Sequence, residues 1–103
     1  MKVSVISPTY KRGWSLPYML DSLRNQTRKP DEIIIVLKRS EDESENIINK
    51  YNDLPIRTLI QKEGGVPQAY DLGIKNAQGD LLLFIDDDAI AEPLWIEKYI
   101  TFF

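Results

Sequence analysis

Three consecutive carboxylates, Asp86, Asp87 and Asp88, are the side chains of this sequence best suited to chemistry. They follow an unbroken apolar run, residues 81–85, which is typical of a strand buried on both faces in a parallel sheet. Two like charges about 4 Å apart repel by roughly 1 kcal/mol in water and roughly 4 kcal/mol at an effective dielectric constant near 20. Ligands of open parallel sheets bind beyond the carboxyl ends of the strands, where these acids lie. The sequence therefore predicts a divalent-cation and substrate site at the end of this strand.

The missing residue types narrow the chemistry of that site. The chain contains no histidine and no cysteine, which excludes histidine-based triads, imidazole metal ligands and disulfides. Carboxylates are then the only plausible protein ligands for a cation. Because hard oxygen ligands favour Mg²⁺ or Mn²⁺ over Zn²⁺, the expected cofactor is Mg²⁺ or Mn²⁺.

Two basic pairs accompany the acids. Lys11 and Arg12 follow the first expected strand, and Lys38 and Arg39 follow the second. In a doubly wound sheet the loops after these strands share one edge with the loop that carries the acids. Basic side chains that face a carboxylate cluster suit a phosphate-bearing ligand, held partly by side chains and partly through a metal. Each pair taken singly is also consistent with ordinary solvated loop charges.

The composition allows one ordinary domain. The chain has 103 residues, 43% hydrophobic and 28% charged, which is the size and balance of a single globular domain with one modest core. A net charge of −3 without a basic tail gives no reason to expect a nucleic acid polymer as partner. The start of the chain lacks the apolar run of a signal peptide, and no segment could span a bilayer. We therefore expect a cytoplasmic location, with membrane association only through regions absent from this chain.

Strand-like and helix-like segments alternate along the chain. The expected strands are residues 2–7, ended by Pro8, then 32–37, 56–61 and 81–85. The expected helices are residues 15–26, a helix opened by a capping box of Ser40 and Glu43, residues 67–77, and a last helix from about residue 92. Repeated strand–helix units with short connections imply an α/β fold, a Rossmann-like three-layer α/β/α arrangement around a mainly parallel sheet.

The order of several motifs gives a family resemblance that covers essentially the whole chain. The motifs are residues 7–12 (SPTYKR), residues 30–36 (PDEIIIV), Gly64 and Gly65 with Gly73, residues 75–80 (KNAQGD) and residues 84–88 (FIDDD). Together they resemble the N-terminal, nucleotide-sugar-binding half of a family 2 glycosyltransferase with the GT-A fold. The resemblance implies a sheet of order 3-2-1-4 and an inverting transfer of a sugar from a nucleotide-diphosphate sugar to an acceptor hydroxyl.

The resemblance also implies roles for individual residues. Asp86 and Asp88 match the outer acids of the D-x-D motif and would be the metal ligands, with the metal bridging the diphosphate. On an extended stretch, residues two apart face the same side, so these two carboxylates should converge while Asp87 points elsewhere. The residues expected to bind the donor nucleotide are Pro8, Thr9, Tyr10, Arg12, Lys38, Asp71, Asp86 and Asp87.

The sequence departs from the family pattern at two places. Lys38 lies in the stretch where the family commonly has Asp-Asp-Gly-Ser, and a lysine cannot accept a base N–H as a carboxylate would. Tyr70 and Asp71 replace the arginine and the amide that usually follow the Gly-Gly segment. These changes leave the fold prediction intact and leave the base of the donor open.

The expected partners are a nucleotide-diphosphate sugar and a saccharide or lipid-linked acceptor. In family members the catalytic base lies in the second half of the catalytic domain, so no residue here is assigned that role and the isolated chain is expected to be inactive. The apolar end at Phe102 and Phe103 agrees with a single donor-binding domain, residues 1–103, cut from a larger catalytic domain. Two other functions stay open, a non-catalytic nucleotide- or metal-binding module and a nucleotidyltransferase-like domain. The latter would show a glycine-rich loop after the first strand.

Overall fold

Strands and helices alternate along the described part of the chain, residues 1–40 and 42–102 of the computed structural model, so Phe103 lies outside it. The elements are β1 (Val3–Thr9), α1 (Leu16–Arg24), β2 (Glu32–Lys38), α2 (Ser44–Asn49), β3 (Ile56–Gln61), α3 (Val66–Asn76), β4 (Leu81–Phe84) and α4 (Trp95–Thr101). The predicted alternation is confirmed. None of these helices is long and apolar enough to span a bilayer.

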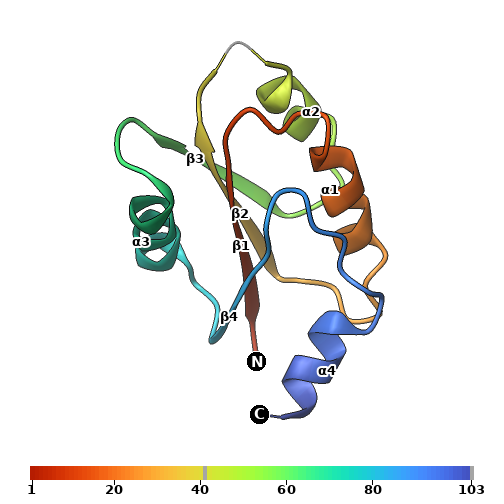
Figure 1. Ribbon diagram of the computed structural model, residues 1–103. Helices are drawn as coiled ribbons and strands as arrows, with labels where there is room; N and C mark the ends of the chain where they lie inside the picture. Colours follow the sequence, from red (N-terminus) through yellow and green to blue (C-terminus); the bar gives the residue numbers. More distant parts are fainter. Residues whose placement is uncertain (41, 103) are drawn as a thin grey trace.

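The four strands form one parallel sheet in the order β3-β2-β1-β4 (Figure 1). The chain moves outward from β1 through β2 to β3 and then crosses to the other side of β1 to add β4. The direction across the sheet therefore reverses between β1 and β4, which is where open α/β sheets bind their ligands. The predicted α/β architecture and strand order are both confirmed.

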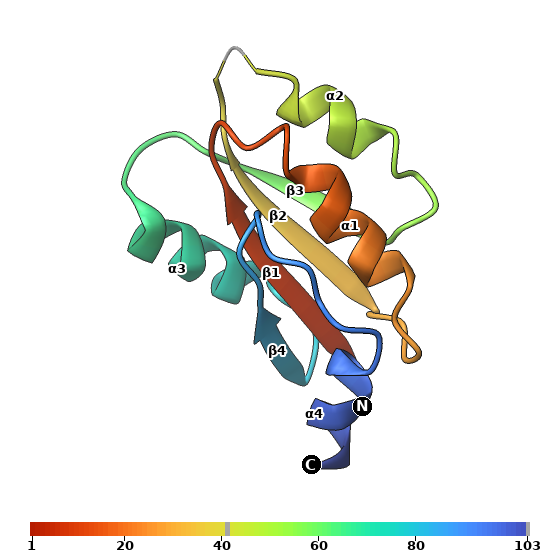
Figure 2. The same ribbon diagram turned by 45° about the vertical axis from the view of Figure 1, so that its right-hand side comes forward.

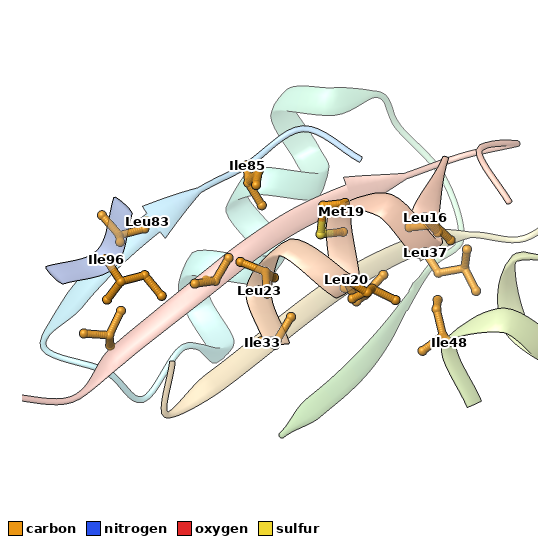
Figure 3. Close-up of a cluster of buried hydrophobic side chains, with 13 residues drawn as sticks. Leu16, Met19, Leu20, Leu23, Ile33, Leu37, Ile48, Leu83, Ile85 and Ile96 are labelled. Atoms are coloured by element: carbon orange, nitrogen blue, oxygen red, sulfur yellow. The ribbon is translucent and has the colours of Figure 1, made fainter. Parts of the chain in front are cut away.

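Helices cover both faces of this sheet (Figures 1 and 2). α1, α2 and α4 contribute to one core cluster, and α3 packs on the opposite face. Alternate residues of β2 divide between the faces, because successive strand side chains point to opposite sides. Burying one leucine or isoleucine side chain contributes about 1.5–3 kcal/mol. Figure 3 shows the side chains that α1 lays on the first face, which are Leu16, Met19, Leu20 and Leu23.

β1 continues beyond its predicted end and includes Pro8. Proline has no N–H to donate, which normally confines it to sheet edges or strand ends. β4 pairs only with residues 3–6 of β1, and the N–H of Ile85 donates to the carbonyl oxygen of Ile6 at 3.1 Å. Alternate residues of β1 direct their backbone groups to that side. The nitrogen of Pro8, which carries no hydrogen, faces the β4 side of β1 beyond the last residue that pairs with β4. No hydrogen bond of the sheet is lost there, so Pro8 lies within β1 and the prediction that it ends the strand was wrong.

β4 differs from the predicted strand buried on both faces. It is a four-residue edge strand, paired with β1 alone in the described part of the chain. Leu83 is buried, but Leu81 and Leu82 are only partly buried and Phe84 is 42% exposed. An apolar run in a sequence shows which side chains are hydrophobic but not which neighbouring elements cover them. It therefore does not distinguish a central strand from an edge strand.

The predicted capping box of α2 does not form. The helix begins at Ser44, and the Ser40 hydroxyl donates to the Asp42 carboxylate at 3.0 Å. Asp42 instead accepts hydrogen bonds from the backbone N–H of Ser44 at 3.2 Å and from its hydroxyl at 2.8 Å. The same carboxylate accepts the N–H of Gly13 at 3.0 Å. Asp42 therefore connects the start of α2 to the loop between β1 and α1.

Candidate functional site

A cavity of about 420 Å³ opens at the carboxyl edge of the sheet. Its wall combines the end of β1 and the loop that follows, the ends of β2 and β3, the start of α3, and the loop after β4. Asp71 lies outside this lining, exposed on α3. The predicted site residues that the structure brings together here are Pro8, Thr9, Tyr10, Arg12, Lys38, Asp86, Asp87 and Asp88.

The chain turns soon after β4, so the three acids do not lie on an extended stretch. The N–H of Ala89 donates to the carbonyl oxygen of Asp86 at 3.1 Å, which closes a turn over residues 86–89. The alternation of a strand stops where β4 ends, at Phe84. All three acids line the same cavity, and the extended stretch on which Asp87 was expected to point elsewhere does not form.

Arg12 brings positive charge to two of the acids. Its Nη1 lies 3.6 Å from Oδ2 of Asp88, and its Nε lies 3.9 Å from Oδ1 of Asp87. The side chain of Asp87 is 13% exposed, whereas that of Asp88 is 48% exposed. Ion pairs this open to water contribute at most about 1 kcal/mol. One guanidinium against three carboxylates leaves this end of the cavity attractive to a further cation.

Burial raises the pKa of Asp87 above its ordinary value, and the charge of Asp88 adds to the rise. The Thr9 hydroxyl, the Arg12 guanidinium and the N–H of Tyr10 act in the opposite direction without reversing it. No hydrogen bond of ordinary geometry joins Thr9 to Asp87 in the described residues, since the Thr9 hydroxyl is buried without a partner. A carboxylate whose ionisation is opposed by burial is stabilised by any cation that enters the cavity.

The loop after β1 holds the loop after β4. The Ser15 hydroxyl lies 2.9 Å from the carbonyl oxygen of Asp87 and 3.1 Å from that of Arg12, and Ser15 is 3% exposed. Although Ser15 is the N-cap residue of α1, its side chain makes no hydrogen bond to the first turn. Lys11 in the same loop has a φ of 56°, a left-handed conformation that is uncommon for residues with a side chain.

Tyr10 presents an aromatic surface to the cavity. The residue is 46% exposed, and the Nζ atoms of Lys11 and Lys38 lie 5.2 and 5.5 Å from its ring centroid. The ammonium group of Lys38 also donates to the carbonyl oxygen of Gly64 at 3.0 Å. An exposed ring with cations beside it can stack on a planar ligand group and leaves positive charge near that ligand.

Sequence reasoning missed part of the cavity wall. The further lining residues are Gln61, Gly64, Gly65, Val66, Ala69 and Tyr70. Gly64 has a φ of 91°, which favours glycine, and the N–H of Gly65 donates to the side chain of Gln68 at 2.8 Å. The Gly-Gly pair was the available signal for a tight turn beside the site. Gln61 carried no such signal, because a single glutamine at a strand end has no distinctive chemistry.

The oxygen atoms around the cavity suit a hard divalent cation. Asp86 and Asp88 are exposed carboxylates on its wall. Within residues 1–40 and 42–102, no group of three or more potential ligands is placed to hold a metal ion by itself. Mg²⁺ commonly takes one or two carboxylates and fills its other positions with phosphate oxygens and water. The residues present therefore fit a metal that is shared with a phosphate-bearing ligand.

Known proteins match this chain along nearly its whole length. The family model described as glycosyl transferase family 2 matches residues 4–103. The glycosyltransferase YwdF of Bacillus subtilis is 37% identical over 102 residues, which cover 95% of this chain and 37% of that protein.

Solved structures share the fold. TarS residues 1–349 of S. aureus, in complex with UDP-GlcNAc, have a TM-score of 0.90 at 30% identity, covering 99% of this chain and 31% of that chain. The mannosyltransferase PcManGT of Pyrobaculum calidifontis, in complex with GDP-Man and Mn²⁺, has a TM-score of 0.79 at 25% identity, covering 86% and 28%. The chain spans about a third of the length of the relatives it matches. It belongs to glycosyl transferase family 2 and has the GT-A fold of these enzymes.

Proposed function

We propose that this chain is the donor-binding part of an inverting glycosyltransferase. The whole protein would transfer a sugar from a nucleotide-diphosphate sugar to the hydroxyl of a saccharide or lipid-linked acceptor. The observation that carries the proposal is the cavity at the carboxyl edge, where three carboxylates and Arg12 share one wall with an exposed aromatic ring. This combination suits a ligand with a planar base, a diphosphate and a bound cation.

The charge distribution supports a diphosphate near the loop after β4. Asp86 and Asp88 would hold Mg²⁺ or Mn²⁺ together with phosphate oxygens, and Arg12 lies close enough to Asp88 to share those phosphates. A bound dication neutralises the negative charge that develops as the nucleotide diphosphate leaves. Arg12 would add to this neutralisation, whereas the acids would repel the diphosphate unless they hold the cation.

The donor class is supported by the related structures. TarS has been crystallised with UDP-GlcNAc, and PcManGT with GDP-Man and Mn²⁺. Both ligands are nucleotide-diphosphate sugars. In this chain we assign the base and ribose to the region of Pro8, Thr9 and Tyr10, where an apolar ring and an aromatic ring line the cavity.

The reaction also needs a base that removes the proton of the attacking acceptor hydroxyl. We assign this base to a part of the protein outside residues 1–103, in line with the chain spanning about a third of the length of its relatives. Residues 1–103 alone would then bind the donor without transferring the sugar.

Thermal unfolding of the purified protein tests the proposal. UDP-, GDP- and dTDP-sugars are added one at a time, with and without Mn²⁺. At least one of them should raise the Tm, and the rise should depend on Mn²⁺ because the metal joins the diphosphate to the acids. Asp88→Ala should remove the metal-dependent part of the rise.

Asp53→Ala is the matched control, since it removes the same charge from an exposed carboxylate that pairs with Arg24. This variant should keep the full metal-dependent rise. Equal stabilisation of wild type and Asp88→Ala would remove Asp88 from the metal site. No stabilisation by any nucleotide sugar, with or without Mn²⁺, would contradict the proposed function.

A further inference from the structure

The loop that joins β1 to α1 carries two cavity-lining residues on either side of a strained one. Tyr10 and Arg12 line the cavity, and Lys11 between them has a φ of 56°. This left-handed conformation is unfavourable for a residue with a Cβ atom, and it persists only where the surroundings hold the backbone. The positions of Tyr10 and Arg12 therefore depend on the contacts that fix the backbone beside Lys11.

Two helices hold the backbone that follows the strained residue. The carbonyl oxygen of Arg12 accepts the N–H of Ser15 at 3.0 Å and that of Leu16 at 3.1 Å, which ties it to the start of α1. The N–H of the next residue, Gly13, donates to Oδ2 of Asp42 at 3.0 Å, beside the start of α2 (Figure 2). Asp42 itself lies outside the lining of the cavity. Any effect of Asp42 on a ligand therefore passes through this loop.

The carboxylate of Asp42 is held in place by further donors. Its Oδ1 accepts the Ser40 hydroxyl at 3.0 Å and the N–H of Ser44 at 3.2 Å, and its Oδ2 accepts the Ser44 hydroxyl at 2.8 Å. Burial opposes the ionisation of Asp42, but these donors and Gly13 outweigh it and lower the pKa of the carboxyl group below its ordinary value. The bond to Gly13 is thus charge-assisted, and such bonds are roughly twice as strong as neutral ones.

The glycine allows the loop to approach α2 closely. A Cβ atom on Gly13 would lie 3.3 Å from Oδ2 of Asp42, 3.3 Å from the backbone nitrogen of Ser44 and 3.4 Å from Cδ1 of Ile47. The first two distances are shorter than ordinary van der Waals contact, so a side chain here would require the loop and the helix to move apart by a few tenths of an ångström. The loop and the start of α2 are therefore packed directly on each other.

Arg12 is the cavity residue that depends most on this attachment. Its guanidinium lies 3.6 Å from the carboxylate of Asp88 and 3.9 Å from that of Asp87, and its side chain is 42% exposed. A long, exposed side chain has many rotamers, so the guanidinium stays near the acids only while its backbone is fixed. Order that exists before a ligand arrives does not have to be created on binding, which favours affinity.

We propose that Asp42 is a positioning residue of the donor site, which acts through the backbone of Gly13 to hold Arg12 where it meets the phosphates of the ligand. Without this carboxylate the backbone at Lys11 can relax, and the guanidinium spreads over several positions. Only a fraction of the molecules then presents Arg12 correctly, and the affinity falls by that fraction. This inference rests on the proposed function, because it requires a phosphate-bearing ligand in the cavity.

Calorimetric titration of the purified protein with UDP, GDP and dTDP in the presence of Mn²⁺ identifies the nucleotide that binds most tightly, which then serves as the probe. Asp42→Ala should weaken its binding about tenfold, the size of effect expected from one lost hydrogen bond. The direction is diagnostic, because the loss of a negative charge would by itself strengthen the binding of an anion. Glu43→Ala is the matched control, since it removes the same charge from a carboxylate that accepts a hydrogen bond from Asn46 at 3.1 Å. This control should not weaken binding.

A double-mutant cycle tests whether Asp42 acts through Arg12. In an Arg12→Met background, Asp42→Ala should weaken binding by at most about twofold. If Asp42→Ala does not fold, Gly13→Ala takes its place in the cycle, because it disturbs the same contact and keeps the carboxylate. Wild-type affinity of the folded variant would overturn the inference, and so would equal losses in the two backgrounds. Failure of wild type to bind any of the three nucleotides would instead overturn the proposed function.

Discussion

The hydroxyl of Ser15 lies 2.9 Å from the carbonyl oxygen of Asp87, and this contact joins two loops that are far apart in the sequence. One loop carries Arg12, and the other carries the acids. The geometry of the negative end of the cavity therefore depends on a side chain that does not itself line it.

Ser15→Ala should lower the free energy of unfolding by about 0.5–1.5 kcal/mol, the net value of one hydrogen bond. It should also weaken Mn²⁺-dependent binding of a nucleoside diphosphate, because the acids lose a fixed attachment. Urea unfolding and calorimetric titration measure the two effects. Thr101→Ala is the control, since that hydroxyl donates only to Glu97 within α4, at 2.9 Å. Wild-type values of both quantities in Ser15→Ala would contradict the role of Ser15.

Asp87→Asn should change how stability depends on pH. Burial raises the pKa of Asp87 above 3.8, so as the pH rises the unfolded chain releases this proton before the folded chain does. Ionisation of Asp87 therefore costs stability as the pH rises from 3.8 through the folded-state value. Relative to wild type, Asp87→Asn should become more stable as the pH rises from 3.8 through the folded-state value of Asp87.

In Asp53→Asn the pH dependence of stability should change in the opposite direction. A hydrogen bond from Arg24 lowers the pKa of Asp53, so its ionised form adds stability that is present above 3.8 and lost as the pH falls. Relative to wild type, Asp53→Asn should lose stability as the pH rises from the folded-state value of Asp53 to 3.8, below the range in which Asp87 acts, and by a small amount because the group is exposed. Parallel pH curves for wild type and Asp87→Asn would contradict the assignment.

Glu32 should stabilise the amino edge of the sheet in a pH-dependent way. It accepts hydrogen bonds from the Ser4 hydroxyl at 2.7 Å, the N–H of Gln78 at 2.9 Å and Arg57 at 3.0 Å. Burial alone would raise the pKa of Glu32, but these donors outweigh it and lower the pKa below 4.5. The stabilisation is present above pH 4.5 and is lost as the pH falls through the folded-state value.

Glu32→Gln should therefore lower the free energy of unfolding at neutral pH by about 1–3 kcal/mol, the cost of breaking up a partly buried hydrogen-bonded group. The difference from wild type should shrink in acid, where wild type has lost the same contribution. Urea unfolding at several pH values measures this, with the exposed Glu63→Gln as control. A difference that does not vary with pH would show that the charge of Glu32 is not involved.

Gly73→Ala should destabilise the protein although it lies within α3. In an exposed helix this change gains about 1 kcal/mol. Here a Cβ atom would lie 2.6 Å from Cγ2 of the buried Ile6 and 3.5 Å from Cγ2 of Val36. Overpacking of this kind costs about 1–3 kcal/mol, enough to exceed the helix gain.

Thermal or urea unfolding measures the effect of Gly73→Ala, and a double-mutant cycle with Ile6→Ala tests its cause. Removing Cγ2 of Ile6 creates space, so Gly73→Ala should cost less in that background. Lys75→Ala on the exposed side of α3 is the control. Equal costs of Gly73→Ala in both backgrounds would exclude the contact with Ile6 as the reason.

The strands could be predicted because the relevant signals are local and strong, and their order followed from the family resemblance. The apolar, mostly branched run from Ile33 to Leu37 supports only a buried strand, and β3 has the predicted bounds. Given a parallel sheet, the loops after the strands must meet at one edge, so the sequence alone assigns Arg12, Lys38 and the acids to a common cavity.

The features that the sequence did not predict depend on contacts between distant parts of the chain. The turn at Asp86 is set by the loop that packs against it, through Ser15, and nothing in three identical residues indicates it. The exposure of Phe84 follows from the absence of a strand beyond β4 in the described chain. Gln61 gained its place on the cavity wall from its register with Lys38, which only the assembled sheet reveals.

The brevity of β4 has a consequence for how this protein responds to heat. The strand is joined to its only described neighbour along four residues, whereas β1 and β2 pair along six. Short one-sided segments open with a lower free energy than the centre of a sheet. On gentle warming the three acids should therefore disperse while β1, β2 and β3 still hold together, so that affinity for the cation disappears at a lower temperature than the fold.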